Sequence, residues 1–355
     1  MLRVWTKARH KNSRLLYHAR NWARLATPGP LYRWGLESLL AEPWSSADRR
    51  EIQRRVDHAY RVGGAFTPGP EARVPSLGLL TRRRNYAFDL LRYARRASSG
   101  VRLDFRFGDE TTDPGRPTLV KARTIDEPSG HSIVFPLNQV RHFVFVRDPL
   151  PFDAKRDLLV WRGAAVRPWR REFLARFFGR PGLDLGCTDR RPEHAAWRRP
   201  FLGIGEQLQY RFILSIEGID VATNLKWILS SNSVCVMAPP TKESWFCESW
   251  LVPGEHYIPV RPDHADLEEQ LARYRREPAA AQRIIRAAQA HVARFRHPQR
   301  EELIALLVLL RYIHDSGQGP LSDRAAGWLA DFGWAAPARP SLAAAAAGGR
   351  RLSVT

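Results

Sequence analysis

The second half of the chain alternates short apolar runs with amphipathic stretches. Short apolar runs are typical of buried strands, whereas apolar residues that recur every three or four positions are typical of helices. Because the two alternate, the pattern predicts an α/β fold in which helices cover both faces of a parallel sheet. The predicted strands are 158–162, 212–216, 233–237 and 256–260, and the predicted helices are 169–178, 221–229, 266–276 and 279–295.

The first half of the chain has a less regular pattern. Residues 1–77 are basic and rich in tryptophan, and Pro-Gly-Pro triplets interrupt them. Helical spacing follows within 76–96, and a last apolar helix is expected at 301–314. Between these helices, β-like runs predict strands at 101–107, 132–137 and 142–146.

The length of 355 residues indicates two domains, since single cores rarely grow beyond about 250–300 residues. The best boundary is the segment from Asp148 to Pro151, where two prolines block regular structure on both sides. We therefore divide the chain into residues 1–150, residues 151–300, a C-terminal helix region at 301–335 and a disordered tail at 336–355.

The composition, 44% hydrophobic and 26% charged, is that of a folded soluble protein and excludes collagen-like, coiled-coil and wholly disordered chains. No apolar run approaches the ~20 residues of a membrane helix. The basic N-terminus lacks the apolar segment of a secretory signal. Cys187, Cys235 and Cys247 form no C-x-x-C pair, so we expect no disulfide framework, no metal site and a cytoplasmic location.

The formal net charge of +20 is the most unusual feature of the composition. Only six of the 56 basic residues are lysines, which leaves fifty arginines (56 − 6). A GC-rich genome explains part of such an enrichment. The remainder favours an acidic partner, either a phosphorylated ligand, an anionic membrane surface or nucleic acid.

One stretch, 210–260, stands out as a candidate ligand site. A predicted strand ends at Ile216, and Glu217-Gly218 then turns sharply into a helix expected to begin near Asp220. Ligands of α/β sheets bind beyond the carboxyl ends of strands, where helix-start amides suit a pyrophosphate. Gly218 would allow close backbone approach, and Glu217 would accept hydrogen bonds from ribose hydroxyls. An ordinary strand-to-helix turn is the alternative interpretation.

Residues 215–227 read S-x-E-G-x-D-V-A-x-N-L-K-W, and S-N-S-V-C-V-M, E-S-W-F-C-E and E-H-Y-I-P-V follow them. Upstream stand L-V-W-R-G-A-A at 159–165, V-R-H-F-V-F-V-R-D at 140–148, V-K-A-R at 120–123 and Gly108-Asp109. Together these motifs resemble glycosyltransferase family 90, which includes bacterial lipopolysaccharide-modifying enzymes and Rumi-type protein O-glucosyltransferases. The resemblance covers roughly 101–295.

The resemblance implies a GT-B-like architecture, in which two Rossmann-like domains face a cleft. Residues 1–150 would form the acceptor side and carry the base, and residues 151–300 would bind the nucleotide sugar. Enzymes of this type transfer sugar with inversion and without a metal or other cofactor. The sequence contains no D-x-D pair of the kind that holds a metal–diphosphate complex.

The resemblance also assigns residues to the donor site. Without a cation, arginines, lysines and backbone amides must meet the diphosphate charge. Arg162, in W-R-G-A, matches a donor-cleft arginine, and Arg170 matches the arginine that closes the Rumi-type motif. Asn224 and Ala164 depart from the Rumi-type pattern, which leaves the donor sugar open. The full predicted donor set is Arg162, Gly163, Arg170, Glu217, Gly218, Asp220, Val221, Ala222, Asn224 and Lys226.

An inverting transfer needs one general base. Asp109, in F-R-F-G-D-E-T, resembles the aspartate that the family uses, and its rivals are Glu110, Asp104 and Asp113. His131 is a weaker candidate for the same cleft. Aromatic rings stack on sugars, so Trp245 and Phe246 are candidate sugar contacts, whereas Trp227 is expected in the core.

We therefore expect a UDP-sugar-dependent glycosyltransferase that modifies lipopolysaccharide core or a related surface glycan. The basic N-terminal region would hold it peripherally on the inner face of an anionic membrane. The sequence leaves open a non-catalytic nucleotide-sugar-binding relative. A nucleic-acid-binding protein is a further alternative, but no helix-turn-helix, zinc-finger or RRM signature supports it, and we expect no nucleic-acid partner.

Overall fold

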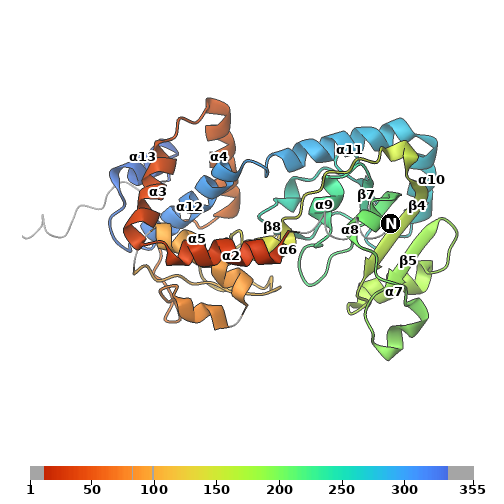
Figure 1. Ribbon diagram of the computed structural model, residues 1–355, viewed down its shortest axis with the longest axis horizontal. Coiled ribbons are helices and arrows are strands. Elements are labelled where there is room, and N and C mark those ends of the chain that lie inside the picture. The colour runs from red at the N-terminus through yellow and green to blue at the C-terminus, as the bar shows by residue number, and fades with distance from the viewer. Residues whose placement is uncertain (1–11, 82, 98–99, 335–355) are drawn as a thin grey trace, which may run out of the picture.

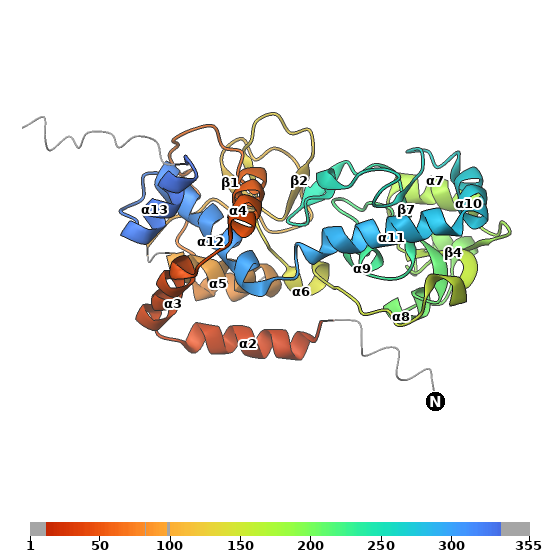
Figure 2. The same cartoon turned by 90° about the horizontal axis from the view of Figure 1, so that it is seen from above.

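The computed structural model describes residues 12–81, 83–97 and 100–334, arranged in two lobes (Figures 1 and 2). The helical lobe comprises residues 12–142 and 298–334, and the sheet lobe comprises residues 143–297. The long helix α11 (Pro278–Ala293) lies along the sheet lobe and leads back into the helical lobe through α12 (Pro298–Asp315). The predicted disordered tail at 336–355 lies outside the described residues.

A five-stranded parallel sheet forms the centre of the sheet lobe. Its spatial order is β5-β4-β6-β7-β9. Counted along the chain this order is 2-1-3-4-5, so the direction of winding reverses between β4 and β6, where such sheets bind ligands. The strands are β4 (Arg156–Gly163), β5 (Leu183–Cys187), β6 (Tyr210–Leu214), β7 (Val234–Met237) and β9 (Ile258–Pro259).

Both faces of this sheet are buried, as the hydrophobic pattern predicts. In β6, Phe212 and Leu214 enter one core and Ile213 enters the other, because successive side chains of a strand point to opposite faces. Helices α7 (Pro168–Phe177) and α10 (Leu267–Arg276) cover the first face, and α9 (Leu225–Leu229) covers the second. Helix α11 contributes to both cores.

The helical lobe is built around α12. Every residue from Leu303 to Leu310 is buried, which explains why this helix is apolar on all sides. Ser13, Ser45 and Ser322 each accept a backbone N–H at a helix start, and these caps fix where three of the surrounding helices begin. The surrounding helices are α2 (Arg14–Ala26), α3 (Gly29–Ala41), α4 (Ser46–Ala59), η1 (Leu77–Thr81), α5 (Arg84–Ala97) and α13 (Asp323–Asp331).

Short strands complete the helical lobe and connect it to the sheet lobe. Strands β1 (Thr118–Val120) and β3 (Ser132–Val134) pair in parallel. Strand β2 (Ala122–Thr124) pairs antiparallel with β8 (Lys242–Ser244), which the sheet lobe supplies. The remaining short elements are α6 (Gln139–His142), η2 (Phe152–Ala154), η3 (Pro192–Trp197), α8 (Ile204–Gln207) and η4 (Glu248–Trp250).

Several sequence predictions of elements were wrong. The helix expected over 221–229 begins only at Leu225. The strand expected over 101–107 is reduced to isolated bridges at Leu103 and Phe105. The strand expected over 142–146 is instead the end of α6 followed by chain without strand pairing. The sequence reading also missed β5, α13 and the three helices within residues 14–59.

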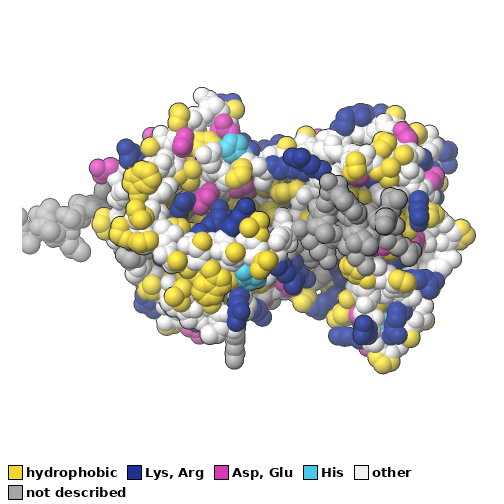
Figure 3. Space-filling view, viewed as in Figure 1, with side chains coloured by type: hydrophobic (Ala, Val, Ile, Leu, Met, Phe, Trp, Pro, Cys, Tyr) yellow, Lys and Arg dark blue, Asp and Glu magenta, His cyan; other side chains and the backbone are white. Residues whose placement is uncertain are grey.

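The surface agrees with the charge of the chain. In Figure 3, Lys and Arg side chains are spread over both lobes rather than gathered in one patch. Within residues 12–81, 83–97 and 100–334, no helix combines the length and apolar character needed to cross a membrane.

Candidate functional site

A cleft of about 370 Å³ lies at the carboxyl ends of β4 and β6, where the winding of the sheet reverses. Both lobes line it, because Asn12, Arg14 and Arg141 of the helical lobe face residues of the sheet lobe. Among the described residues, its lining includes four arginines and no aspartate or glutamate. The arginines are Arg14, Arg141, Arg162 and Arg170. The cleft is therefore suited to an anionic ligand.

Arg170 joins the ends of β4 and β6 by hydrogen bonds to backbone carbonyls. It donates from Nη2 to the Ile216 carbonyl at 2.7 Å and from Nε to the Glu217 carbonyl at 3.1 Å. Burial, with the nearby charge of Arg167, lowers the pKa of Arg170 to about 10. No ion pair with a carboxylate is seen for Arg170 among the described residues. Its positive charge is thus available to an anion in the cleft.

Arg162 also lines the cleft, but its guanidinium is already engaged. It donates from Nη2 to the Asp184 carboxylate at 2.6 Å and from Nε to the Pro200 carbonyl at 3.1 Å. The next residue, Gly163, must be glycine for packing, since a Cβ there would lie 2.6 Å from the Trp161 ring. Arg162 thus braces the cleft wall, and the predicted contact with a diphosphate remains a prediction.

Glu217 sits at a second cavity of about 310 Å³, beside the first and beyond the ends of β6 and β7. Its carboxylate accepts hydrogen bonds from the Thr241 hydroxyl at 2.6 Å and from the amides of Thr241 and Lys242 at 2.9 and 3.1 Å. Gly218, Val221 and Ala222 line the same cavity. Glu217 therefore ties the end of β6 to the segment leading into β8, and the predicted ribose contact remains a prediction.

The loop 215–224 is held by side chains rather than by a helix start. Because α9 begins at Leu225, the predicted row of helix amides near Asp220 is absent from this loop. Asn224 donates to the Leu214 carbonyl at 3.0 Å and accepts from the Ser215 hydroxyl at 3.1 Å. These bonds fix Asn224 at the wall of the first cleft.

A buried lysine joins the two lobes beside the cleft. Lys121 contacts the carboxylate of Asp109 in the helical lobe and lies 2.5 Å from Oδ2 of Asp220 in the sheet lobe. His142 is also buried, with Nε2 3.4 Å from the Lys121 ammonium. The sequence reading named both aspartates but missed Lys121 as a site residue, although it stands in the V-K-A-R motif.

The two aspartates differ in accessibility and in pKa. Asp109 is about one-third exposed, whereas Asp220 is buried. Burial opposes ionisation of Asp109, but the hydrogen bond and charge of Lys121 outweigh it and lower the pKa. Burial dominates at Asp220 and raises the pKa despite Lys121. Of the two aspartates, Asp109 is thus the one with the lowered pKa and the more exposed carboxylate.

The rivals of Asp109 are placed differently. Asp104 is buried and accepts from the Gly69 amide and the Tyr312 hydroxyl. Glu110 pairs with Arg106, and Asp113 pairs with His131 at 3.0 Å. Asp109 differs from them because its Oδ2 lies 4.0 Å from Arg141, a residue of the cleft wall.

Three other predicted site residues lie in buried surroundings. Trp245 packs in the core of the helical lobe and donates to Glu301 at 2.7 Å. Phe246, the next residue, packs instead in a core of the sheet lobe. Lys226 is fully buried and pairs with Glu248 at 2.6 Å. None of the three lines either cavity, whereas Trp227, expected in the core, is buried and also borders the first cleft.

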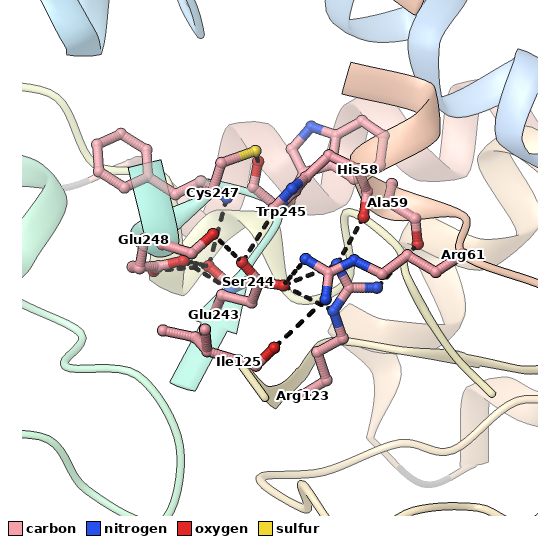
Figure 4. Close-up of polar contacts among 12 residues, drawn as sticks. His58, Ala59, Arg61, Arg123, Ile125, Glu243, Ser244, Trp245, Cys247 and Glu248 are labelled. Atoms are coloured by element: carbon pink, nitrogen blue, oxygen red, sulfur yellow. Dashed lines mark hydrogen bonds and ion pairs between the residues drawn. The ribbon is translucent and has the colours of Figure 1, made fainter. Parts of the chain in front are cut away.

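A second group of buried charges lies between the lobes, next to β2 and β8 (Figure 4). Glu243 is fully buried and lies 2.7 Å from Arg123, 2.9 Å from Arg61 and 2.9 Å from His58. Burial opposes ionisation of Glu243, but these partners and Ser249 outweigh it and lower the pKa to about 2. This group is a buried network of paired charges that holds the lobes together.

One group of potential metal ligands occurs in the described part of the chain, at the end of β5. The ligand atoms of Cys187, Asp189 and His194 lie within 4.8 Å of one another. The Asp189 carboxylate already accepts from His194 at 2.7 Å and from the Ala165 amide at 2.8 Å. Sequence spacing gave no sign of this group, because the fold rather than a short motif brings it together.

Comparison with known proteins gives two findings. The family model described as "Glycosyl transferase family 90" matches residues 145–297. The chain is also 44% identical, over 228 residues, to a protein named "O-glucosyltransferase LpsA" from Dichelobacter nodosus. That alignment covers 64% of this chain and 72% of the relative.

Proposed function

The chain belongs to glycosyltransferase family 90, and from this premise we propose that it moves a hexose or pentose from a UDP-sugar to a hydroxyl of lipopolysaccharide core or a related surface glycan. We propose that the transfer inverts the anomeric centre and needs no metal ion. The relative named O-glucosyltransferase LpsA supports a glycan acceptor and makes UDP-glucose the first donor to test.

The arginine cleft at the ends of β4 and β6 is the observation that carries this proposal. A nucleoside diphosphate brings negative charge, and the described lining offers four arginines, of which Arg162 is paired with Asp184. Arg170 is the best placed of them, because it is half-buried and, in the described part of the chain, its hydrogen bonds go to backbone carbonyls. A guanidinium matches the geometry of phosphate oxygens, so Arg170 would bind the departing diphosphate.

Asp109 would act as the general base. The acceptor oxygen attacks the anomeric carbon and forms the new C–O bond, while the bond from that carbon to the diphosphate breaks. The acceptor proton passes to the Asp109 carboxylate, whose pKa is lowered because the effect of burial is outweighed by the hydrogen bond and charge of Lys121. Asp220, through Lys121, would couple the position of the base to the donor loop.

The two lobes fit a GT-B-like division of labour. The sheet lobe would hold the donor, and the helical lobe supplies Arg14 and Arg141 to the opposite wall, with Asp109 next to Arg141. The described residues of the helical lobe contain only one pair of parallel strands, so the proposal of a second Rossmann-like domain rests on the family rather than on this sheet. We likewise retain residues 1–150 and 151–300 as the proposed acceptor and donor domains.

A UDP-release assay tests the function directly. Purified protein is incubated with UDP-glucose, UDP-galactose or UDP-xylose in the presence of EDTA. We expect UDP release from one donor, insensitive to EDTA and reduced about 10²–10⁴-fold by Asp109→Asn. Asp113→Asn is the matched control, since Asp113 is an exposed carboxylate paired with His131.

Three results would contradict the proposal. Release that stops on adding EDTA would overturn the metal-free mechanism. An unchanged rate in Asp109→Asn would remove Asp109 as the base. The absence of both turnover and UDP binding by calorimetry would favour a relative without this activity.

A further inference from the structure

Helices α2 and α3 expose large apolar side chains to solvent. Leu15 on α2 is 83% exposed, and Leu31 and Trp34 on α3 are 63% and 72% exposed. Yellow side chains are visible over both helices in Figure 3. Leu16 and Trp22 are also about half exposed. Several exposed apolar residues on neighbouring helices are typical of a surface that interacts with a partner or a membrane.

The opposite side of α2 packs against the helical lobe. The exposed apolar side is therefore not the side by which α2 joins the core. Tyr17 donates to Asp89 of α5 at 2.7 Å, and Asn21 is buried. Arg95 of α5 donates to the carbonyls of Arg24 and Thr27 and fixes the end of the helix. Helix α2 is thus amphipathic, with a docked side and an apolar, basic side.

The charge of this region identifies the partner. The first 36 residues contain eight Lys or Arg residues and no Asp or Glu, and the first acidic residue of the chain is Glu37. Arg14, Arg20 and Arg33 are exposed among the apolar side chains. Apolar residues that insert at the interface, flanked by basic residues, are the pattern of helices that lie on anionic bilayers.

The same region borders the proposed active site. Asn12 donates to the carbonyls of Val140 and Phe143 at 3.2 and 2.9 Å. Asn12 and Arg14 also line the arginine cleft. A surface that binds a bilayer through α2 therefore brings the cleft to the lipid–water boundary.

We propose that the exposed side of α2 and α3 binds an anionic lipid bilayer and that the acceptor is a glycolipid presented at that surface. The first part stands on the surface itself, and the second rests on the proposed glycosyltransferase function. The surface would thus favour acceptors that are anchored in the bilayer, in addition to any selection by the cleft itself.

Vesicle sedimentation with the full chain tests the surface. Vesicles of phosphatidylcholine with phosphatidylglycerol are compared with vesicles of phosphatidylcholine alone. We expect binding to the anionic vesicles only, weakened at least about tenfold in the double variant Leu15→Asp/Trp34→Asp. Val252→Asp is the matched control, because Val252 is an exposed apolar residue of the sheet lobe.

A charge-reversal pair separates the electrostatic part. Arg20→Glu/Arg33→Glu should weaken anionic vesicle binding, whereas Arg283→Glu/Arg286→Glu, on the exposed side of α11, should leave it unchanged. UDP release by Leu15→Asp/Trp34→Asp in solution should match the unmodified chain. Transfer to a glycolipid embedded in vesicles should fall with vesicle binding.

The outcomes distinguish this inference from the proposed function. Failure of the unmodified chain to sediment with anionic vesicles, or equal sedimentation of the double variant, would overturn the inference while leaving UDP release intact. A change of oligomeric state in the double variant without vesicle binding would assign the surface to a second copy of the chain and also overturn it. Vesicle binding without UDP release would instead count against the proposed function.

Discussion

Two groups of charges between the lobes differ in how completely they are paired. Around Glu243, one fully buried carboxylate contacts Arg123, Arg61 and His58, so that the carboxylate finds its partners within the protein. In the arginine cleft, Arg162 is paired with Asp184, whereas Arg170 donates to backbone carbonyls and forms no ion pair that is seen among the described residues. A buried charge with partners in the protein holds the fold, whereas an arginine without a counter-ion can bind a charged ligand. The comparison therefore assigns the Glu243 group to structure and leaves Arg170 as the proposed ligand contact.

The largest effect is expected on stability at the Glu243 network. Glu243→Gln leaves Arg123, which is fully buried, without its counter-charge. Removal of one partner from a buried pair costs about 3–5 kcal/mol, and we expect a loss of this size in the free energy of unfolding measured by denaturant titration.

An exposed ion pair provides the control for this variant. Glu268 pairs with Arg180 at 2.6 Å, and both side chains are about half exposed. Glu268→Gln should cost less than about 1 kcal/mol, because solvent screens such pairs. An equal decrease in the free energy of unfolding in the two variants would show that burial does not make the Glu243 network more stabilising than an exposed ion pair.

The pH dependence of stability should report the same network. The pKa of Glu243 falls from 4.5 to about 2 on folding, so its contribution is complete above about pH 4.5 and is lost as the pH falls toward 2. A shift of this size corresponds to about 3 kcal/mol. His58 acts in the same direction, since burial lowers its pKa and protonation therefore favours unfolding. Unfolding midpoints measured between pH 7 and pH 3 should decline more steeply in the unmodified chain than in Glu243→Gln.

A smaller effect, and one on function rather than stability, is expected at Arg170. Arg170→Ala should reduce kcat/KM for the donor about 10–100-fold, which corresponds to one charge-assisted bond of about 1.5–3 kcal/mol. Arg171→Ala is the matched control, because Arg171 is also half-buried and also donates to backbone carbonyls, yet it does not line the cleft. Steady-state kinetics in which both variants lose activity equally would contradict the assignment of Arg170 to the diphosphate.

The sheet lobe was the predictable part of the fold. Its strands carry local signals, because β4, β6 and β7 are short apolar runs buried on both faces. The helical lobe was harder to predict, because its strands have three residues each and owe their pairing to distant segments. Strand β2, for example, finds its partner β8 about 120 residues away.

Motifs located the region of the site but not the environment of each side chain. Arg170, Glu217 and Asn224 line cavities, and their contacts with a donor remain predictions. Lys226, Trp245 and Phe246 belong to the same motifs but are buried in structural contacts. Lys121, in contrast, was not predicted as a site residue. Its contacts with Asp109 and Asp220 depend on the tertiary fold, so its sequence motif could not reveal them.

The place of α12 in the helical lobe has a consequence for the order of folding. Residues 36–137 supply much of that lobe's core, yet the helix at its centre begins only at Pro298. The sheet lobe, from β4 to α11, is continuous in the chain and leaves the ribosome before α12 does. Domains generally fold as units during synthesis. The helical lobe is therefore synthesised first but cannot complete its core until α12 has been made. We expect the sheet lobe to complete its core before the helical lobe does.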